Sequence, residues 1–90
     1  MGVCNALLID GKDNVCVMNQ PVTSGETVCF YREEELVELA ALEDIPVFFK
    51  MAVSRINQGG AVIKYGTRIG LATRDISAGE MVHTHNLASG

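Results

Sequence analysis

The stretch Ile76-Ser77-Ala78-Gly79-Glu80-Met81-Val82 carries the pattern that decides the fold. An aliphatic residue is followed three positions later by glycine and three positions after that by valine, and the pattern recurs at residues 22–28 and 56–62. In each copy we expect the first aliphatic residue to be buried, the chain to turn at Gly25, Gly59 or Gly79, and the valine to open a new strand. Because the copies are unequally spaced, they predict one corner used three times rather than a solenoid.

Short apolar runs rich in β-branched residues surround these corners. They lie at residues 6–9, 15–18, 27–31, 47–53, 62–65, 69–73 and 81–85. Each run has the length of a strand and is bounded by turn-forming residues, so we predict an all-β chain. Residues 33–42 are the one segment rich in helix formers, and they fit either a short helix or a charged hairpin connection with Leu36 and Leu39 tucked in.

Length and charge limit what such a chain can do. We expect residues 1–90 to form one small domain, which buries roughly 60–65% of its extended surface and has no room for a deep private cleft. An active site would therefore need a partner. Seven basic and eleven acidic residues give a net charge of −4 without a cluster of Lys or Arg, which argues against binding to nucleic acid.

The amino-terminal residues and the cysteines indicate a compartment. The first residues lack a basic region, and Asp10 soon interrupts the apolar run, so we predict no signal peptide and no membrane anchor. Cys4, Cys16 and Cys29 are odd in number and lack a C-x-x-C spacing, which favours small buried hydrophobes in a reducing environment. These features predict a cytoplasmic protein.

Residues 82–86, with the sequence Val-His-Thr-His-Asn, are the most distinctive candidate for chemistry. If they form a strand, His83 and His85 lie on the same face, roughly 6–7 Å apart at the backbone. That arrangement suits joint ligation of a metal or joint clamping of an anion, although two ligands fall short of the usual metal count. The alternative is a pair of histidines near a frayed terminus without a function.

A second candidate is the turn Lys64-Tyr65-Gly66-Thr67-Arg68. An ammonium and a guanidinium around a glycine turn could hold a carboxylate, with Arg68 binding bidentately and Lys64 acting as a point charge. The alternative is a solvated hairpin tip.

Four segments taken together resemble the SAF-type domain of the altronate/galactarate dehydratase family. They lie at residues 62–66, 69–73, 75–80 and 82–87. The resemblance extends from about residue 6 to residue 87. The family includes sugar-acid dehydratases, in which this domain accompanies a large catalytic part, and sulfolactate sulfo-lyases, whose small subunit is a free-standing chain of this kind.

The resemblance implies a β-clip fold of bent strands with glycine corners and a metal-assisted lyase that removes water or sulfite from a hydroxy acid. It implies a divalent metal, iron(II) by expectation, shared with a large catalytic subunit. The matching positions are His83, His85 and Asn86 for catalysis, His83 and His85 also as metal ligands, and Lys64, Tyr65 and Gly66 for substrate binding.

One departure from the family pattern concerns Phe48 and Phe49, which stand where the family usually has glycine and histidine, while Lys50 matches. The departure leaves open an altered substrate, a relocated metal site, an assembly role with weakened chemistry, or an enlarged apolar contact with a partner. Phe48 and Phe49 are our candidates for a subunit interface, with a buried core role as the alternative.

The sequence thus predicts the small subunit of a two-component lyase, inactive alone, whose partners are a large subunit and a hydroxy-acid substrate. Self-association of the isolated chain, as a homo-oligomer, stays open. The alternative function is a non-catalytic SAF-type binding or assembly module, and the neighbouring reading frame would discriminate between the two.

Overall fold

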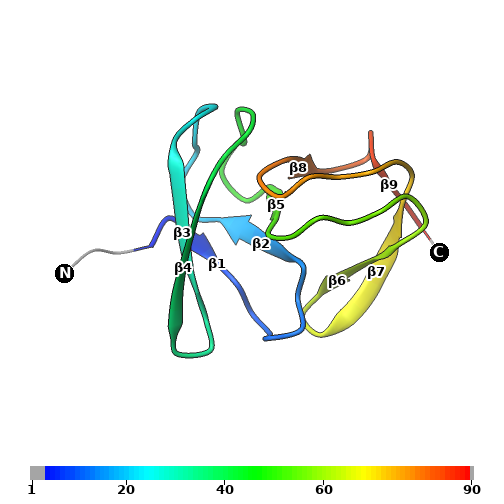
Figure 1. Cartoon of the computed structure of the whole chain (residues 1–90), viewed down its shortest axis with the longest axis horizontal. Helices are drawn as coiled ribbons and strands as arrows, with labels where there is room; N and C mark the ends of the chain where they lie inside the picture. The colour runs from blue at the N-terminus through cyan, green and yellow to red at the C-terminus, as the bar shows by residue number, and fades with distance from the viewer. Residues whose placement is uncertain (1–3, 90) are drawn as a thin grey trace.

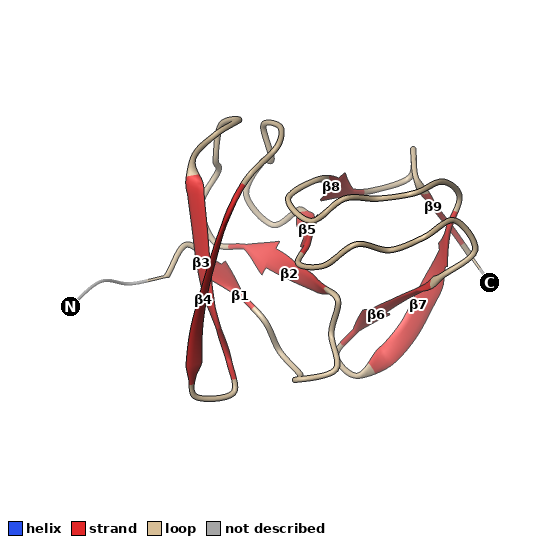
Figure 2. Ribbon diagram, viewed as in Figure 1, coloured by secondary structure: helices blue, strands red, loops and turns tan. Residues whose placement is uncertain are grey.

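A computed structural model describes residues 4–89, and that part of the chain contains strands, turns and no helix (Figure 2). The strands are β1 (Ala6–Leu7), β2 (Val15–Met18), β3 (Thr27–Arg32), β4 (Glu35–Ala40), β5 (Lys50–Ala52), β6 (Ala61–Lys64), β7 (Thr67–Ala72), β8 (Met81–Val82) and β9 (Leu87–Ala88). The predicted all-β class is confirmed.

All strand pairs are antiparallel. A central sheet has the order β1-β2-β5-β8, β3 pairs with β4, and β6, β7 and β9 form a third sheet. Figure 1 shows the β3–β4 hairpin at one end of the long axis, the β6–β7 hairpin toward the other end, and the central sheet between them. Because the strands are short, the chain changes direction often, and the corners determine the shape.

The three predicted glycine corners are confirmed. Gly25, Gly59 and Gly79 have φ angles of 93°, 82° and 97°, and each stands shortly before a new strand. The flanking aliphatic residues are all buried, namely Val22, Val28, Ile56, Val62, Ile76 and Val82. The repeated sequence pattern therefore encodes a repeated backbone geometry.

The glutamate after two of these glycines closes the turn. Glu26 accepts a hydrogen bond from the backbone N–H of Thr23 at 2.6 Å, and Glu80 accepts one from Ser77 at 3.1 Å. In each case the carboxylate satisfies a turn amide that would otherwise face solvent, which explains why glutamate recurs at these positions.

A fourth corner of the same form lies at residues 45–50, where the sequence pattern did not predict one. Phe48 occupies the position of the corner glycine with φ 71°, so the strand predicted at residues 47–53 begins only at Lys50. Isolated bridges then join the corners in pairs, Val22 with Ile45 and Ile56 with Ile76. The segment from β2 to β5 and the segment from β5 to β8 are thus built on one plan of corner, hairpin and corner.

Each of these two segments has its own hydrophobic core. One cluster fills the half with β3 and β4 and contains Met18, Phe30, Ile45 and Met51, and the other fills the half with β6 and β7 and contains Val62, Ile76 and Val82. The aliphatic residues that open and close the corners therefore supply a large part of both cores, which couples corner geometry to stability.

The segment 33–42 forms a hairpin strand, so the helix alternative is wrong and the hairpin alternative is confirmed. Glu33 and Glu34 make the turn, with Glu33 at φ 57°. Leu39 packs against the core as expected, whereas Leu36 lies on the outer face and is 50% exposed. Alternation along β4 produces this difference, because residues three apart lie on opposite faces of a strand.

The cysteines follow the prediction only in part. Cys16 is fully buried, and burial raises the pKa of its thiol to about 12. Cys4 and Cys29 are half-buried, which corrects the expectation of buried hydrophobes. A hydrogen bond with Cys29, followed by burial, raises the pKa of the Cys4 thiol to about 11.

Asp13 connects the two halves of the chain. Its carboxylate is buried and accepts hydrogen bonds from the backbone N–H groups of Asp10 at 3.0 Å and Gly66 at 2.8 Å. We expect Asp13→Ala to lower the free energy of unfolding by about 2–3 kcal/mol, because two amides lose a charged acceptor. Chemical denaturation measures this change, with the exposed Lys12→Ala as the matched control; equal stabilities for the two variants would contradict the assignment.

Candidate active-site turn and lysine pair

The histidines lie in a turn rather than in a strand. β8 ends at Val82, residues 83–86 turn, and the backbone N–H of Asn86 donates to the carbonyl of His83 at 3.1 Å. The predicted alternation of His83 and His85 on one strand face is therefore wrong. Both side chains are exposed at the surface, at two positions of a single tight turn.

Asn86 holds this turn closed. Its side chain is fully buried, its Oδ1 accepts from the backbone N–H of His83 at 2.9 Å, and its Nδ2 donates to the carbonyl of Met81 at 2.9 Å. Both polar ends of the amide are thus engaged by backbone groups. In this structure Asn86 positions the histidines, and its own catalytic role stays a prediction.

Replacing Asn86 should loosen the turn. We expect Asn86→Ala to lower the free energy of unfolding by about 2 kcal/mol, because a buried donor and a buried acceptor lose their partner. Asn86→Asp should also destabilise, since the carboxylate cannot donate to Met81. Thermal unfolding tests both, with the exposed Thr84→Ala in the same turn as the control. Wild-type stability in both Asn86 variants would contradict the role assigned to the amide.

His83 is held against an aromatic ring. Lys50 pairs with Val82 in the β5–β8 register, and one step beyond that pair the ring of Phe49 meets His83 with centroids 4.8 Å apart. Phe49 also packs against the core of the β3–β4 half. The Phe49 ring therefore fixes one side of His83 and leaves its other side to solvent.

The second predicted group forms the β6–β7 hairpin turn. Tyr65 and Gly66 are its two central residues, with φ 58° and 71°, and the Lys64 Nζ lies 4.7 Å from the centroid of the Tyr65 ring. The Gly66 amide already donates to Asp13. Tyr65 and Arg68 are exposed and Lys64 is half-buried, so their side chains can contact a ligand.

Lys50 is a further cation that the sequence did not single out as a site residue. Burial, and secondly the charge of Lys64, lower the pKa of the Lys50 ammonium below its ordinary value. Within residues 4–89 the one ion pair joins Arg55 and Asp75, so neither lysine is neutralised by a carboxylate in that part of the protein. Lys50 and Lys64 lie on strands of two different sheets, β5 and β6, which explains why sequence spacing does not reveal that the charge of one acts on the other.

The candidate residues thus form two groups. Phe49 and His83 contact each other just beyond the paired ends of β5 and β8, where Lys50 and Val82 are the last register pair. Phe49 therefore belongs with the histidine turn, whereas Lys50 is linked to the Lys64 turn by the repulsion between their charges. It does not by itself enclose both groups in one cavity.

The lysine pair has a predictable effect on stability. A Lys50 pKa lowered by folding means that the charged form is penalised in the folded state, fully so below the folded pKa. Stability should therefore rise as the pH increases from the folded pKa toward about 10.5, the unfolded value. Lys50→Met should match or exceed the wild-type Tm at pH 7 and lose that advantage above about pH 10.5. A Lys50→Met protein that is less stable at pH 7 would contradict this.

The histidines can supply only part of a metal site. In the region that the structure describes, no three His, Cys, Asp or Glu side chains gather where they could hold a metal ion. His83 and His85 are the two histidines of the chain, and neutral imidazole suits divalent iron and zinc. Two imidazoles are fewer than the three or four protein ligands of a usual metal site, so His83 and His85 could provide only part of one.

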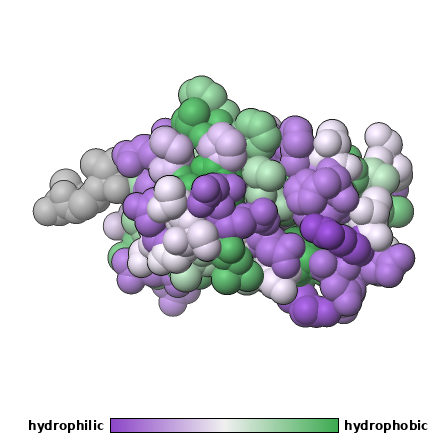
Figure 3. Space-filling model, turned by 90° about the horizontal axis from the view of Figure 1, so that it is seen from above, coloured by the Kyte–Doolittle hydropathy of each residue, from purple (hydrophilic) through white to green (hydrophobic). Residues whose placement is uncertain are grey.

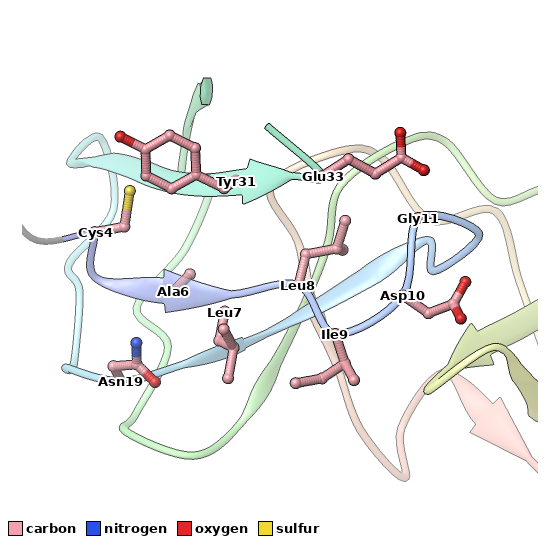
Figure 4. Close-up of a pocket in the computed structure, with 10 residues that line it drawn as sticks. All are labelled: Cys4, Ala6, Leu7, Leu8, Ile9, Asp10, Gly11, Asn19, Tyr31 and Glu33. Carbon is pink, nitrogen blue, oxygen red and sulfur yellow. The ribbon is translucent and has the colours of Figure 1, made fainter. Parts of the chain in front are cut away.

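A cleft of about 570 Å³ lies elsewhere, between β1 and β3. Figure 4 shows Tyr31 on one side of β1, with Leu7 and Ile9 pointing away from it. None of the predicted site residues lines this cleft. In the view of Figure 3, hydrophilic residues predominate over the half of the molecule that holds β6 to β9, which is the half with the lysine turn.

Comparison with known proteins adds a family and several relatives. The family model described as the altronate/galactarate dehydratase SAF domain matches residues 4–90. The chain is 35% identical over 78 residues to altronate dehydratase of Bacillus subtilis strain 168 and 38% identical over 78 residues to altronate dehydratase of Escherichia coli K12. Each match covers 87% of this chain and 15% of the dehydratase.

A third relative is shorter. Over 48 residues the chain is 44% identical to the (2R)-sulfolactate sulfo-lyase subunit alpha of Paracoccus pantotrophus, which covers 53% of this chain and 72% of that subunit. The chain therefore spans a small part of the dehydratases it matches and most of a protein that is named as a subunit. Within the described residues, no helix is long and apolar enough to cross a membrane.

Proposed function

This chain belongs to the altronate/galactarate dehydratase SAF-domain family, and we propose that it is the small subunit of a two-component lyase acting on a hydroxylated carboxylic acid. The relatives named as altronate dehydratases and as a sulfo-lyase subunit place the family among lyases. The proposal assigns the rest of the active site to a separate large subunit.

The observation that carries the proposal is the incompleteness of the site. His83 and His85 are exposed on a surface turn, and the described part of the chain offers no third metal-ligating side chain beside them. Elimination from a carboxylic acid requires a base, stabilisation of a developing enolate and protection from water. A surface turn provides none of these alone, whereas a second subunit covering the turn can provide all three.

In the assembled enzyme, His83 and His85 would hold iron(II) together with ligands from the large subunit. The metal would supply Lewis-acid stabilisation of the negative charge that develops on the carboxylate as the α proton leaves. Asn86 keeps both imidazoles in place through the closed turn, and Phe49 supports the ring of His83. A base of the large subunit would accept the α proton, and the β substituent would leave either as sulfite or as hydroxide that takes up a proton to form water.

The lysine turn would bind the substrate. Lys64 and Tyr65 present an ammonium and a phenol at the hairpin tip, and Lys50 adds a second ammonium whose pKa is already lowered by burial and by Lys64. A bound carboxylate would relieve the repulsion between the two lysines, so binding favours an anion at this position. Gly66 contributes the tight turn that places Lys64 and Tyr65 side by side.

Co-expression with a dehydratase-type large chain, sought in the reading frames next to the one that encodes this chain, tests the assembly. We expect the two chains to purify as one complex that contains bound iron, and we expect the double variant His83→Ala/His85→Ala to form the complex with at least about a 10-fold lower iron content. Elemental analysis of the purified complex measures this. Two chains that never associate would refute the subunit assignment, and full iron content in the double variant would refute the ligand assignment.

A further inference from the structure

Phe48 has an unfavourable backbone conformation and an unfavourable environment at once. Its φ of 71° lies in the left-handed region, which bulky residues rarely adopt. Its side chain is 77% exposed, the highest exposure among the large hydrophobic residues of the described chain. A buried contact could offset the backbone strain, but the phenyl ring of Phe48 has little contact with the rest of the protein.

The corner itself does not need a phenylalanine. The Phe48 N–H donates to the Met18 carbonyl at 2.7 Å, as the Gly79 N–H donates to the Ala52 carbonyl at 2.8 Å. The other three corners form the same turn with glycine, which adopts positive φ without strain. Glycine at position 48 would therefore form this corner with less strain, and the phenyl ring contributes little to the stability of the isolated chain.

Phe48 stands beside the candidate active-site turn. The next residue, Phe49, carries the ring that packs on His83 at a centroid distance of 4.8 Å. A protein that covers the exposed side of His83 to complete a metal site must approach this surface. An exposed aromatic ring at that position has the properties of an interface anchor, because such rings dominate binding energy when they enter an apolar pocket.

We propose that Phe48 is the anchor by which the large lyase subunit docks on this chain, with the phenyl ring inserted into an apolar pocket of that subunit next to the histidine turn. This inference rests on the proposed function, because the large subunit is its partner. A second copy of the chain is a poorer occupant, because it would bring only the same two histidines. The match covers 15% of each dehydratase relative, so a far larger remainder of those proteins is available to supply the rest of a site.

The test compares Phe48→Gly with wild type in two measurements. Phe48→Gly should raise the Tm of the isolated chain, because glycine removes the backbone strain. The same change should weaken binding to the large subunit at least about 10-fold, measured by titration calorimetry with the dehydratase-type large chain. Opposite effects on stability and on binding distinguish an anchor from a residue with a structural role.

Two further variants sharpen the result. Phe48→Leu keeps a bulky side chain with the strain and should bind better than Phe48→Gly. Leu36, which is half-exposed on the β3–β4 hairpin, supplies the control, and Leu36→Ala should bind like wild type.

If wild type binds and Phe48→Gly binds equally well, the anchor is refuted and the proposed function stands. If wild type does not bind, both fail. If Phe48→Gly instead abolishes a wild-type homodimer and leaves binding of the large subunit unchanged, the surface is a self-interface and the anchor is refuted.

Discussion

Replacing either His83 or His85 with alanine in the assembled lyase should lower turnover at least about 100-fold while leaving the complex intact. Both side chains are exposed, so their removal leaves no cavity in either core. His85→Ala should keep the wild-type Tm, whereas His83→Ala should lower it slightly, because the contact with the Phe49 ring is lost. Steady-state kinetics and thermal unfolding on the same preparations measure both effects.

Thr84→Ala is the matched control, since Thr84 is exposed in the same turn and offers no imidazole. It should retain wild-type turnover. Wild-type turnover in both histidine variants would show that neither imidazole belongs to the active site.

Among Gly→Ala substitutions at the three glycine corners, Gly79→Ala should lower the free energy of unfolding the most. A Cβ at Gly79 would overlap the Ala40 carbonyl oxygen, a backbone atom, in addition to the strain of φ 97°. At Gly25, with φ 93°, a Cβ meets nothing within 4 Å. We expect Gly25→Ala to lower the free energy of unfolding by about 1–2 kcal/mol from backbone strain alone, and Gly79→Ala by more than about 3 kcal/mol.

Chemical denaturation of the two variants side by side separates conformational strain from steric clash. If Gly79→Ala unfolded no more readily than Gly25→Ala, the close packing of the Gly79 corner on β4 would be wrong. The comparison also tests the contact between the two halves of the chain, because Ala40 ends β4 in one half and Gly79 lies in the other.

The corners were predictable because glycine marks positive φ in the sequence and the flanking aliphatic residues mark burial. The corner at Phe48 was not, since the residue that adopts positive φ there carries a side chain that argues against it. The missed corner also displaced the predicted strand start, because residues 47–49 are apolar and read as strand. A local sequence pattern therefore predicts a positive φ only where the residue at that position is one that commonly adopts it, such as glycine.

The sequence indicated which residues are candidates for the site, but it did not predict how the backbone arranges them. The alternation expected for His83 and His85 fails because Asn86 binds back to residues 81 and 83 and ends β8 early. Nothing in the sequence indicates that an amide at position 86 would do so. The effect of the Lys64 charge on Lys50 depends on how the fold places β5 and β6, which belong to different sheets, and composition and spacing do not encode that placement.

Reconstitution of activity from separately purified chains tests the central claim most directly. Each chain is assayed alone and mixed in equal amounts, with iron(II) present, for elimination of water from altronate and of sulfite from sulfolactate. We predict no activity for this 90-residue chain alone and activity on one of the two acids when the dehydratase-type large chain is added. Elimination by this chain alone, or full activity of the large protein without it, would contradict the account.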